Sequence, residues 1–162
     1  VSTESQVVNR RDDLAYYSKL LNIPKLNYRI DQNCKSFTSI CAGQKIVDLS
    51  LIGEESKYLV QNVREKLGAT KVTTVLCLPS GSSRQLITSQ INNYRDFQPI
   101  IAFTKVDECQ LYPRELCVLA YENVKVGFMT GSQTILSSLA LSEPNVLATH
   151  LDSYITDELH YE

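Results

Sequence analysis

The sequence has no long hydrophobic run and no cluster of basic residues. Its longest apolar stretches, such as Val75–Leu78 and Pro99–Phe103, fall far short of the roughly 20 residues that span a bilayer. The polar start Val-Ser-Thr-Glu-Ser-Gln does not resemble a signal peptide. The chain has 16 Lys and Arg against 18 Asp and Glu, so its net charge is −2. It therefore lacks the excess of positive charge that attracts nucleic acid. We therefore expect a cytoplasmic protein that does not bind nucleic acid.

The cysteines and histidines also lack the spacings that hold metals or perform catalysis. Five cysteines are an odd number with no CxxC pair, so the sequence suggests neither a disulfide framework nor a CxxC metal site. His150 and His160 have no nucleophile or ligand pattern around them, so the sequence predicts no catalytic residue and no metal site. We expect reduced thiols, of which Cys77 and Cys117 behave as small apolar side chains. The five are Cys34, Cys41, Cys77, Cys109 and Cys117.

What the chain does contain is a regular alternation of helical and strand-like periods, which is typical of an α/β fold. The expected helices are 12–21, 33–42, 54–67, 84–94, 113–121 and 145–155, and the expected strands are 26–30, 45–51, 72–78, 100–104 and 124–129. The strands are mostly apolar on both faces, so we predict a mostly parallel sheet of about five strands with helices on both faces. These three layers form a single domain over residues 1–162, and ligands should bind beyond the carboxyl ends of the strands.

Two of the loops at those strand ends carry a recognisable pattern. The apolar strand 100–104 ends in Thr104-Lys105-Val106-Asp107, and the strand 124–130 is followed by Gly131-Ser132-Gln133. In this order the two loops resemble the base-contacting loops of SRP-type (SIMIBI) GTPases, with the FlhF branch of flagellar biosynthesis the most similar. The resemblance implies a guanine site in which Asp107 accepts hydrogen bonds from guanine N1 and N2 while the Lys105 stem lies along the base. Thr104, Gly131, Ser132 and Gln133 would complete that site.

The same resemblance extends over nearly the whole chain. Residues 72–80 with the helix at 85–95 are similar to the family's strand ending in Leu-Pro or Leu-Ser and its following helix. Residues 1–5 with the helix up to Leu21 are similar to its Thr-Thr-Asp-Thr-Tyr-Arg segment. The implied fold is therefore a truncated P-loop-NTPase-like G domain.

The segments that bind the nucleotide phosphates in this family are missing or changed in the present sequence. No G-x-x-x-x-G-K-[ST] loop occurs in the sequence, so it contains no cradle of backbone N–H groups for phosphates. Asp48 and Gly53 match the ends of the family's Asp-Thr-Ala-Gly segment but stand two residues too far apart. Val7 replaces its arginine, and Tyr112-Pro113 replaces its Gly-Gly pair. Because the family's P-loop strand lies inside the sheet, we expect the neighbouring strands to close up or a second chain to fill the place.

These observations favour a degenerate FlhF-like domain, a pseudo-GTPase that does not hydrolyse GTP and acts through a protein partner or a homodimer. The family implies a role in flagellar or membrane-targeting assembly and a location at the inner face of the cell membrane. No cofactor is expected, except GTP and Mg²⁺ if nucleotide binding survives. The alternative is an active GTP hydrolase whose P-loop lies outside this sequence or on a partner chain.

Structural roles also compete with each functional interpretation. Asp107 could be a helix cap and Lys105 a solvated charge, and Asp48 could simply form a turn. The Ser80–Ser83 segment could bind an anion, although serines that cap a helix are more common.

Overall fold

The computed structural model describes residues 2–3, 13–25, 27–28, 46–49, 53–109, 111–131 and 139–159. The helix predicted over residues 33–42, together with Cys34 and Cys41, lies outside this part of the chain. The structure divides into two compact units, Val1–Val72 and Thr73–Glu162, and each is described by itself. The expected single domain over residues 1–162 stays a prediction.

Within its described residues, the first unit contains a small parallel sheet and the helices α1 and α2. β1 (Ser2–Thr3) lies in the middle of the sheet, between β2 (Asn27–Tyr28) and β3 (Asp48–Leu49). Helix α1 (Asp13–Leu20) follows β1, so the chain returns to a parallel strand through a helical crossover, as parallel pairing requires. This unit therefore has the α/β organisation that the alternating pattern predicts.

Helix α2 (Glu54–Leu67) has the bounds that the sequence predicts, because both of its ends are signalled locally. Glu54 and Glu55 lie in the first turn, where the helix dipole favours negative charge. At the other end, the Gly68 N–H donates to the Arg64 carbonyl, and the positive φ of 90° at Gly68 suits glycine. A 3-10 turn, η2 (Ala69–Lys71), follows.

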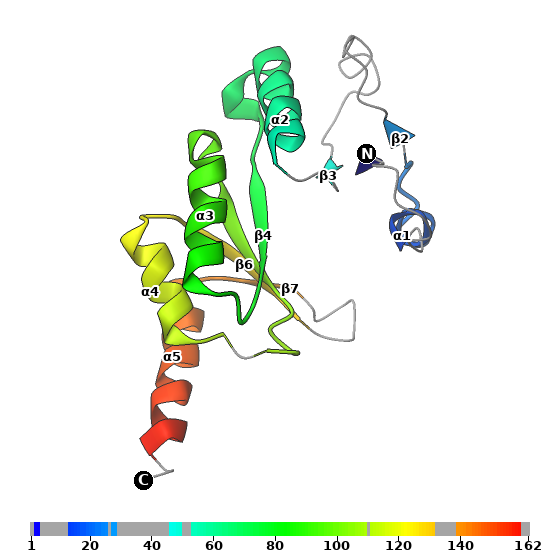
Figure 1. The fold of residues 1–162 in the computed structure, drawn as a ribbon. Coiled ribbons are helices and arrows are strands. Elements are labelled where there is room, and N and C mark those ends of the chain that lie inside the picture. The colour runs from blue at the N-terminus through cyan, green and yellow to red at the C-terminus, as the bar shows by residue number, and fades with distance from the viewer. Residues whose placement is uncertain are drawn as a thin grey trace. The chain divides into compact units, whose positions relative to one another are not determined.

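The second unit is built on a four-stranded sheet in the order β4-β5-β6-β7 (Figure 1). β4 (Val75–Pro79), β5 (Ile100–Thr104) and β6 (Val126–Thr130) are parallel, and β7 (Leu139–Leu141) runs antiparallel to β6. The connecting elements are α3 (Arg84–Tyr94), η3 (Arg95–Phe97), α4 (Pro113–Tyr121) and α5 (Pro144–Leu159).

One face of this sheet carries the core. Side chains that alternate along β4 and β5, including Leu78, Ile101 and Phe103, pack against α3 and α4. Helix α3 contributes Ile87 and Ile91, both with no exposed surface. Figure 1 shows α3 and α4 side by side next to the strands. The remaining members of the core cluster are Leu111, Val118 and Leu119.

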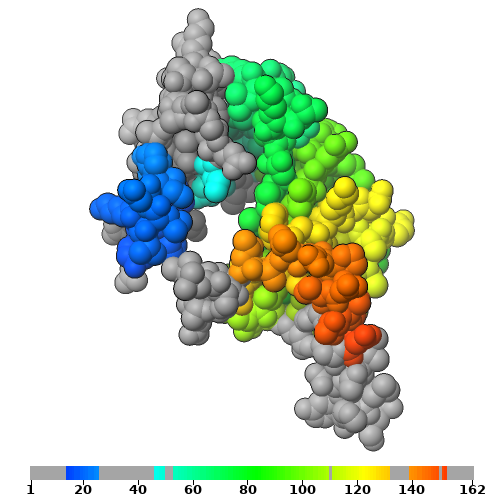
Figure 2. Space-filling model, turned by 180° about the vertical axis from the view of Figure 1, so that it is seen from behind, coloured from blue at the N-terminus to red at the C-terminus, as the bar shows by residue number. Residues whose placement is uncertain are grey.

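The opposite face of the sheet retains exposed apolar side chains. The strand register aligns Cys77, Ala102, Phe128 and Leu141 in one row across the four strands. Leu141 is 60% exposed, and both Leu139 and Cys77 are also exposed. Figure 2 shows β7 and the start of α5, in orange, at the surface of the molecule. Cys77 and Cys117, which lie within apolar runs of the sequence, are both exposed.

The structure confirms the α/β class and the mostly parallel sheet, and it refines the arrangement of the strands. The described strands belong to a three-stranded sheet in the first unit and a four-stranded sheet in the second. The antiparallel strand β7 was not expected, and α5 begins one residue earlier and ends four residues later than the helix predicted over residues 145–155.

Candidate functional site

The candidate site lies at the carboxyl ends of β4, β5 and β6, where parallel strands bring three connections to one edge. Backbone hydrogen bonds join these connections just beyond the strands. The Ser80 N–H donates to the Thr104 carbonyl at 2.8 Å, and the Val106 N–H donates to the Thr130 carbonyl at 3.2 Å. The segment after β5 is thus held on both sides, as expected for a loop that presents ligand-binding groups at this edge.

The segment that begins at Thr104 forms a tight turn with an unusual backbone. Lys105 has a φ of 60°, the left-handed region that a residue with a Cβ adopts at an energetic cost. Its carbonyl accepts hydrogen bonds from the N–H groups of Glu108 (3.1 Å) and Cys109 (3.0 Å), which closes the turn. Backbone strain of this kind, held in place by surrounding contacts, is frequent at binding sites.

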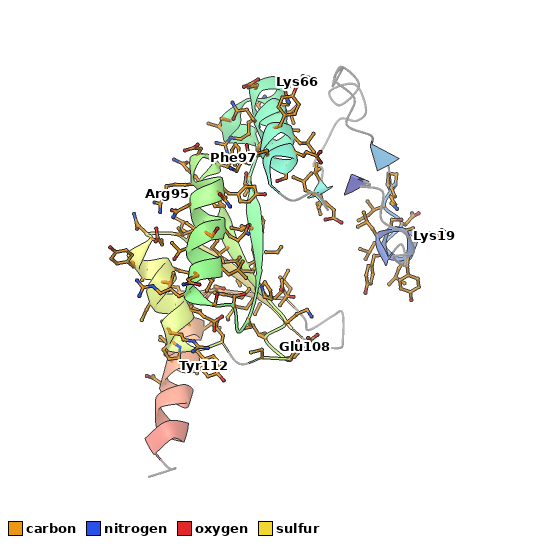
Figure 3. The ribbon with its side chains drawn as sticks, viewed as in Figure 1. Lys19, Lys66, Arg95, Phe97, Glu108 and Tyr112 are labelled. Carbon is orange, nitrogen blue, oxygen red and sulfur yellow. The ribbon has the colours of Figure 1, made fainter. Side chains whose placement is uncertain are left out.

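The charged side chains of this turn are open to solvent. The Lys105 Nζ lies 3.0 Å from the Glu108 Oε2, and both side chains are more than half exposed, so this ion pair contributes little to stability. Asp107 is exposed too. Figure 3 shows Glu108 in this segment and Tyr112 at the start of α4. The exposed Lys105 and Asp107 are accessible to a ligand, and their exposure also fits the alternative of solvated charges.

Gly131, the first residue after β6, lies directly against this turn. A Cβ added to Gly131 would lie 2.6 Å from each of three atoms, namely the backbone N of Val106, the backbone N of Asp107 and the Cγ2 of Val106. Only glycine allows such a close approach of two backbones. The structure therefore brings Gly131 together with Thr104, Lys105 and Asp107, whereas Ser132 and Gln133 lie outside the described residues.

A buried carboxylate at this edge was not found by sequence reasoning. Glu115 of α4 is 1% exposed, and its two oxygens accept hydrogen bonds from different segments. Its Oε1 accepts from the Gly81 N–H and its Oε2 from the Tyr112 N–H, each at 2.8 Å. The available signal was local, because Pro113 at the first helical position and Glu115 at the third are typical of a helix start.

The Ser80–Ser83 segment acts as a helix start. The Ser83 hydroxyl accepts from the Leu86 N–H at 3.2 Å and so caps α3, and the Ser82 hydroxyl donates to the Pro79 carbonyl at 2.6 Å. Gly81 has a φ of 79°, and its N–H already donates to the Glu115 carboxylate. These bonds favour the capping interpretation of this segment over an anion-binding one.

The two residues assigned to the degenerate phosphate-side loop belong to the first unit. Asp48 is an exposed residue of β3, and Gly53, with a φ of 78°, is the N-cap residue that precedes helix α2. The Gly53 carbonyl accepts hydrogen bonds from the Lys57 N–H and the Ser56 hydroxyl. In the described part of the chain, no group of three or more His, Cys, Asp or Glu side chains is arranged to hold a metal ion.

Tyr112 and Pro113 form the start of α4, where the family has a Gly-Gly pair. The Arg114 guanidinium carbon lies 4.9 Å from the centre of the Tyr112 ring, a cation–π geometry.

Among the described helices, none is both long enough and apolar enough to cross a membrane.

Comparison with known proteins identifies the fold. No family model matches the sequence, and no curated protein matches it. Solved structures of FlhF do match. A crystal structure of FlhF with GTP and Mg²⁺ has a TM-score of 0.64 over 88% of this chain and 57% of its own, at 18% identity. A crystal structure of FlhF with GMPPNP and Mg²⁺ has a TM-score of 0.67 over 93% of this chain and 60% of its own, also at 18% identity. The chain thus spans about three fifths of these proteins, and the likeness confirms the predicted SRP-type GTPase fold.

Proposed function

We propose that this chain is a degenerate FlhF-like SRP-type GTPase domain that keeps a guanine-base site and acts through a protein partner without hydrolysing GTP. The observation that carries the proposal is the contact of Gly131 with the backbone of Val106 and Asp107. That contact joins the two loops that would enclose a guanine base.

The chemistry of the exposed turn suits guanine. The Asp107 carboxylate offers two acceptor oxygens, which match the N1–H and N2–H donors on one edge of the base. The aliphatic stem of Lys105 can cover one face of the base while its ammonium group stays in water. Adenine has no such pair of donors, so the site would discriminate against ATP.

The phosphate side supports the non-hydrolysing part of the proposal. Nucleoside triphosphates are held mainly by backbone N–H groups, a lysine and a magnesium ligand, and the sequence contains no loop of that kind. The Gly81 N–H, at a helix start where a phosphate could bind, already donates to Glu115. Base recognition without phosphate contacts gives weak binding, which suits a domain that works by binding another protein. The family's flagellar and membrane-targeting roles, at the inner face of the cell membrane, belong to the same proposal.

The second candidate is an active GTPase whose phosphate-binding loop lies outside residues 1–162 or on a partner chain. What favours it is that the FlhF structures hold GTP or GMPPNP with Mg²⁺ and are longer than this chain. In that case GTP would bind far more tightly to a longer protein than to this domain.

Thermal unfolding with added nucleosides tests the proposal. Guanosine at 100 times its dissociation constant would stabilise the folded state by about 2.7 kcal/mol, because it binds only that state. Guanosine, GDP and GTP should stabilise the chain similarly, with no requirement for Mg²⁺ and no release of phosphate, and adenosine should have no effect. A Mg²⁺-dependent preference for GTP with phosphate release would support the active GTPase instead.

The variant Asp107→Asn makes this test specific. An asparagine places an amide donor where the base has N2–H, so the variant should lose guanosine binding and gain xanthosine binding, since xanthine has an oxygen at C2. Asp96→Asn is the matched control, because Asp96 is an exposed aspartate of η3. If millimolar guanosine stabilises neither the parent chain nor the control, the guanine site does not exist. If Asp107→Asn keeps its preference for guanosine, Asp107 does not contact the base.

A further inference from the structure

Glu115 joins two connections that are far apart in the sequence. Its carboxylate accepts one hydrogen bond from Gly81, 34 residues away, and one from Tyr112, at the start of its own helix. Both bonds are 2.8 Å long, and the side chain is 1% exposed. A carboxylate that is withdrawn from water in this way needs both partners, because a buried charge with unmet hydrogen bonds is strongly unfavourable.

Both partners of Glu115 adjoin the turn that presents Lys105 and Asp107. Tyr112 ends the segment that starts at Lys105, and the residue before it, Leu111, is 1% exposed in the core. Gly81 contacts the Cys109 side chain so closely that a Cβ on Gly81 would overlap the sulfur. The Cys109 N–H in turn donates to the Lys105 carbonyl at 3.0 Å.

These contacts form a continuous path from Glu115 to the exposed turn. One branch fixes the place where the segment joins α4. The other branch fixes the position of Gly81, which contacts the Cys109 side chain. The left-handed backbone of Lys105 is strained, so it persists only where neighbouring contacts hold it.

We propose that Glu115 is a positioning residue that holds the turn of residues 105–109 in the shape that presents Lys105 and Asp107. It does so by tying the turn after β4 and the start of α4 to a single carboxylate. The identity of the ligand that binds this turn rests on the proposed function. The role of Glu115 in holding the turn does not depend on it. Glu115 contacts no ligand in this account and acts only through Gly81, Tyr112 and Cys109.

Amide hydrogen exchange on the whole chain tests the proposal without any ligand. The variants are Glu115→Ala, which removes both acceptors, and Glu115→Gln, which keeps the shape and one acceptor oxygen. Ser83→Ala is the control, because it removes the cap of α3 on the same β4–α3 connection. Exchange is read at the amides of Gly81, Glu108, Cys109 and Tyr112.

Glu115→Ala should accelerate exchange at these four amides by about tenfold or more, since hydrogen bonds to charged groups are among the stronger ones. Glu115→Gln should give a smaller acceleration at the same amides. Ser83→Ala should lower the melting temperature and accelerate exchange at the start of α3 while leaving Glu108 and Cys109 unchanged. If Glu115→Ala does not fold, the Glu115→Gln comparison decides the question.

Two results would overturn the proposal. One is unchanged exchange at Glu108 and Cys109 in the foldable Glu115 variant. The other is an equal acceleration in Ser83→Ala, which would reveal a general loss of stability. Guanosine titration then separates the two ideas. If the parent chain binds guanosine, Glu115→Gln should weaken that affinity more than Ser83→Ala does. If the parent chain binds none, the proposed function fails and the exchange data still decide the role of Glu115.

Discussion

The contact between Gly131 and the turn after β5 predicts a large effect of one added methyl group. In the variant Gly131→Ala, the new Cβ would lie 2.6 Å from two backbone nitrogens and one methyl carbon, where ordinary contact begins near 3.4 Å. The φ of Gly131 is outside the left-handed region, so an alanine is not strained by its own backbone. The whole effect therefore comes from steric overlap.

The overlap has to be relieved by moving backbone. The gap must widen by about 0.8 Å, and two of the three atoms belong to the backbone of Val106 and Asp107. Inserting a methyl group into a packed contact typically costs about 1–3 kcal/mol. For a unit the size of residues 73–162, a loss of about 2 kcal/mol lowers the melting temperature by roughly 8–16 °C. The displaced turn should also bind guanosine more weakly than the parent chain does.

Gly127→Ala provides a matched control on the same strand. There the added Cβ would overlap the Cγ2 of Ile100, which is a side-chain atom. Removing that atom with Ile100→Ala should therefore recover part of the stability that Gly127→Ala loses. Removing the Val106 methyl with Val106→Ala should not rescue Gly131→Ala, because the two backbone nitrogens remain in place. Thermal and urea unfolding of the single and double variants measure both coupling energies.

The steric argument is refuted by either of two outcomes. A melting temperature for Gly131→Ala within about 2 °C of the parent chain would mean that Gly131 does not contact the turn, given the shift expected from overlap. A full rescue by Val106→Ala would mean that only the side-chain methyl was in the way.

Two further predictions concern the two faces of the four-stranded sheet. Ile87→Ala should lower the free energy of unfolding by about 2–5 kcal/mol in urea, because Ile87 has no exposed surface and its loss leaves a cavity; a loss below about 1 kcal/mol would place it outside the core. Leu141→Lys should change the melting temperature little, since Leu141 is 60% exposed, and should reduce any self-association seen by light scattering at high concentration. A strongly destabilised Leu141→Lys chain would instead show that this face is buried.

Much of the fold could be predicted because the signals are local. The predicted bounds of α2, α3, β5 and α4 agree with the structure, since each element is defined by its own apolar period and by the residues at its ends. Proline at the start of α4 and glycine after α2 act over one or two residues. Such signals do not depend on what the rest of the chain does.

The parts that the sequence did not predict depend on distant residues. β7 is three residues long and exists by pairing with β6, so no period reveals it. The apolar neighbours of Cys77 do not reveal its exposure, which depends on which face of the sheet the helices cover. Glu115 reads as an ordinary charge in a first helical turn, and its link to Gly81 is set by the fold. That Gly131 and this turn belong to one site was expected from the resemblance alone, and their backbone contact was not predicted.

The two hydrogen bonds that the Glu115 carboxylate accepts also limit how sequences with this arrangement can diverge. Because one carboxylate satisfies amides from two connections, a change to an apolar residue at position 115 leaves the Gly81 and Tyr112 N–H groups without an acceptor at the same time. Such a change would have to arrive together with another acceptor or with room for a water molecule. Because both donors are backbone N–H groups, which every residue except proline carries, the constraint falls on position 115 itself, and a variant library selected for folding should keep a side chain with an acceptor oxygen there.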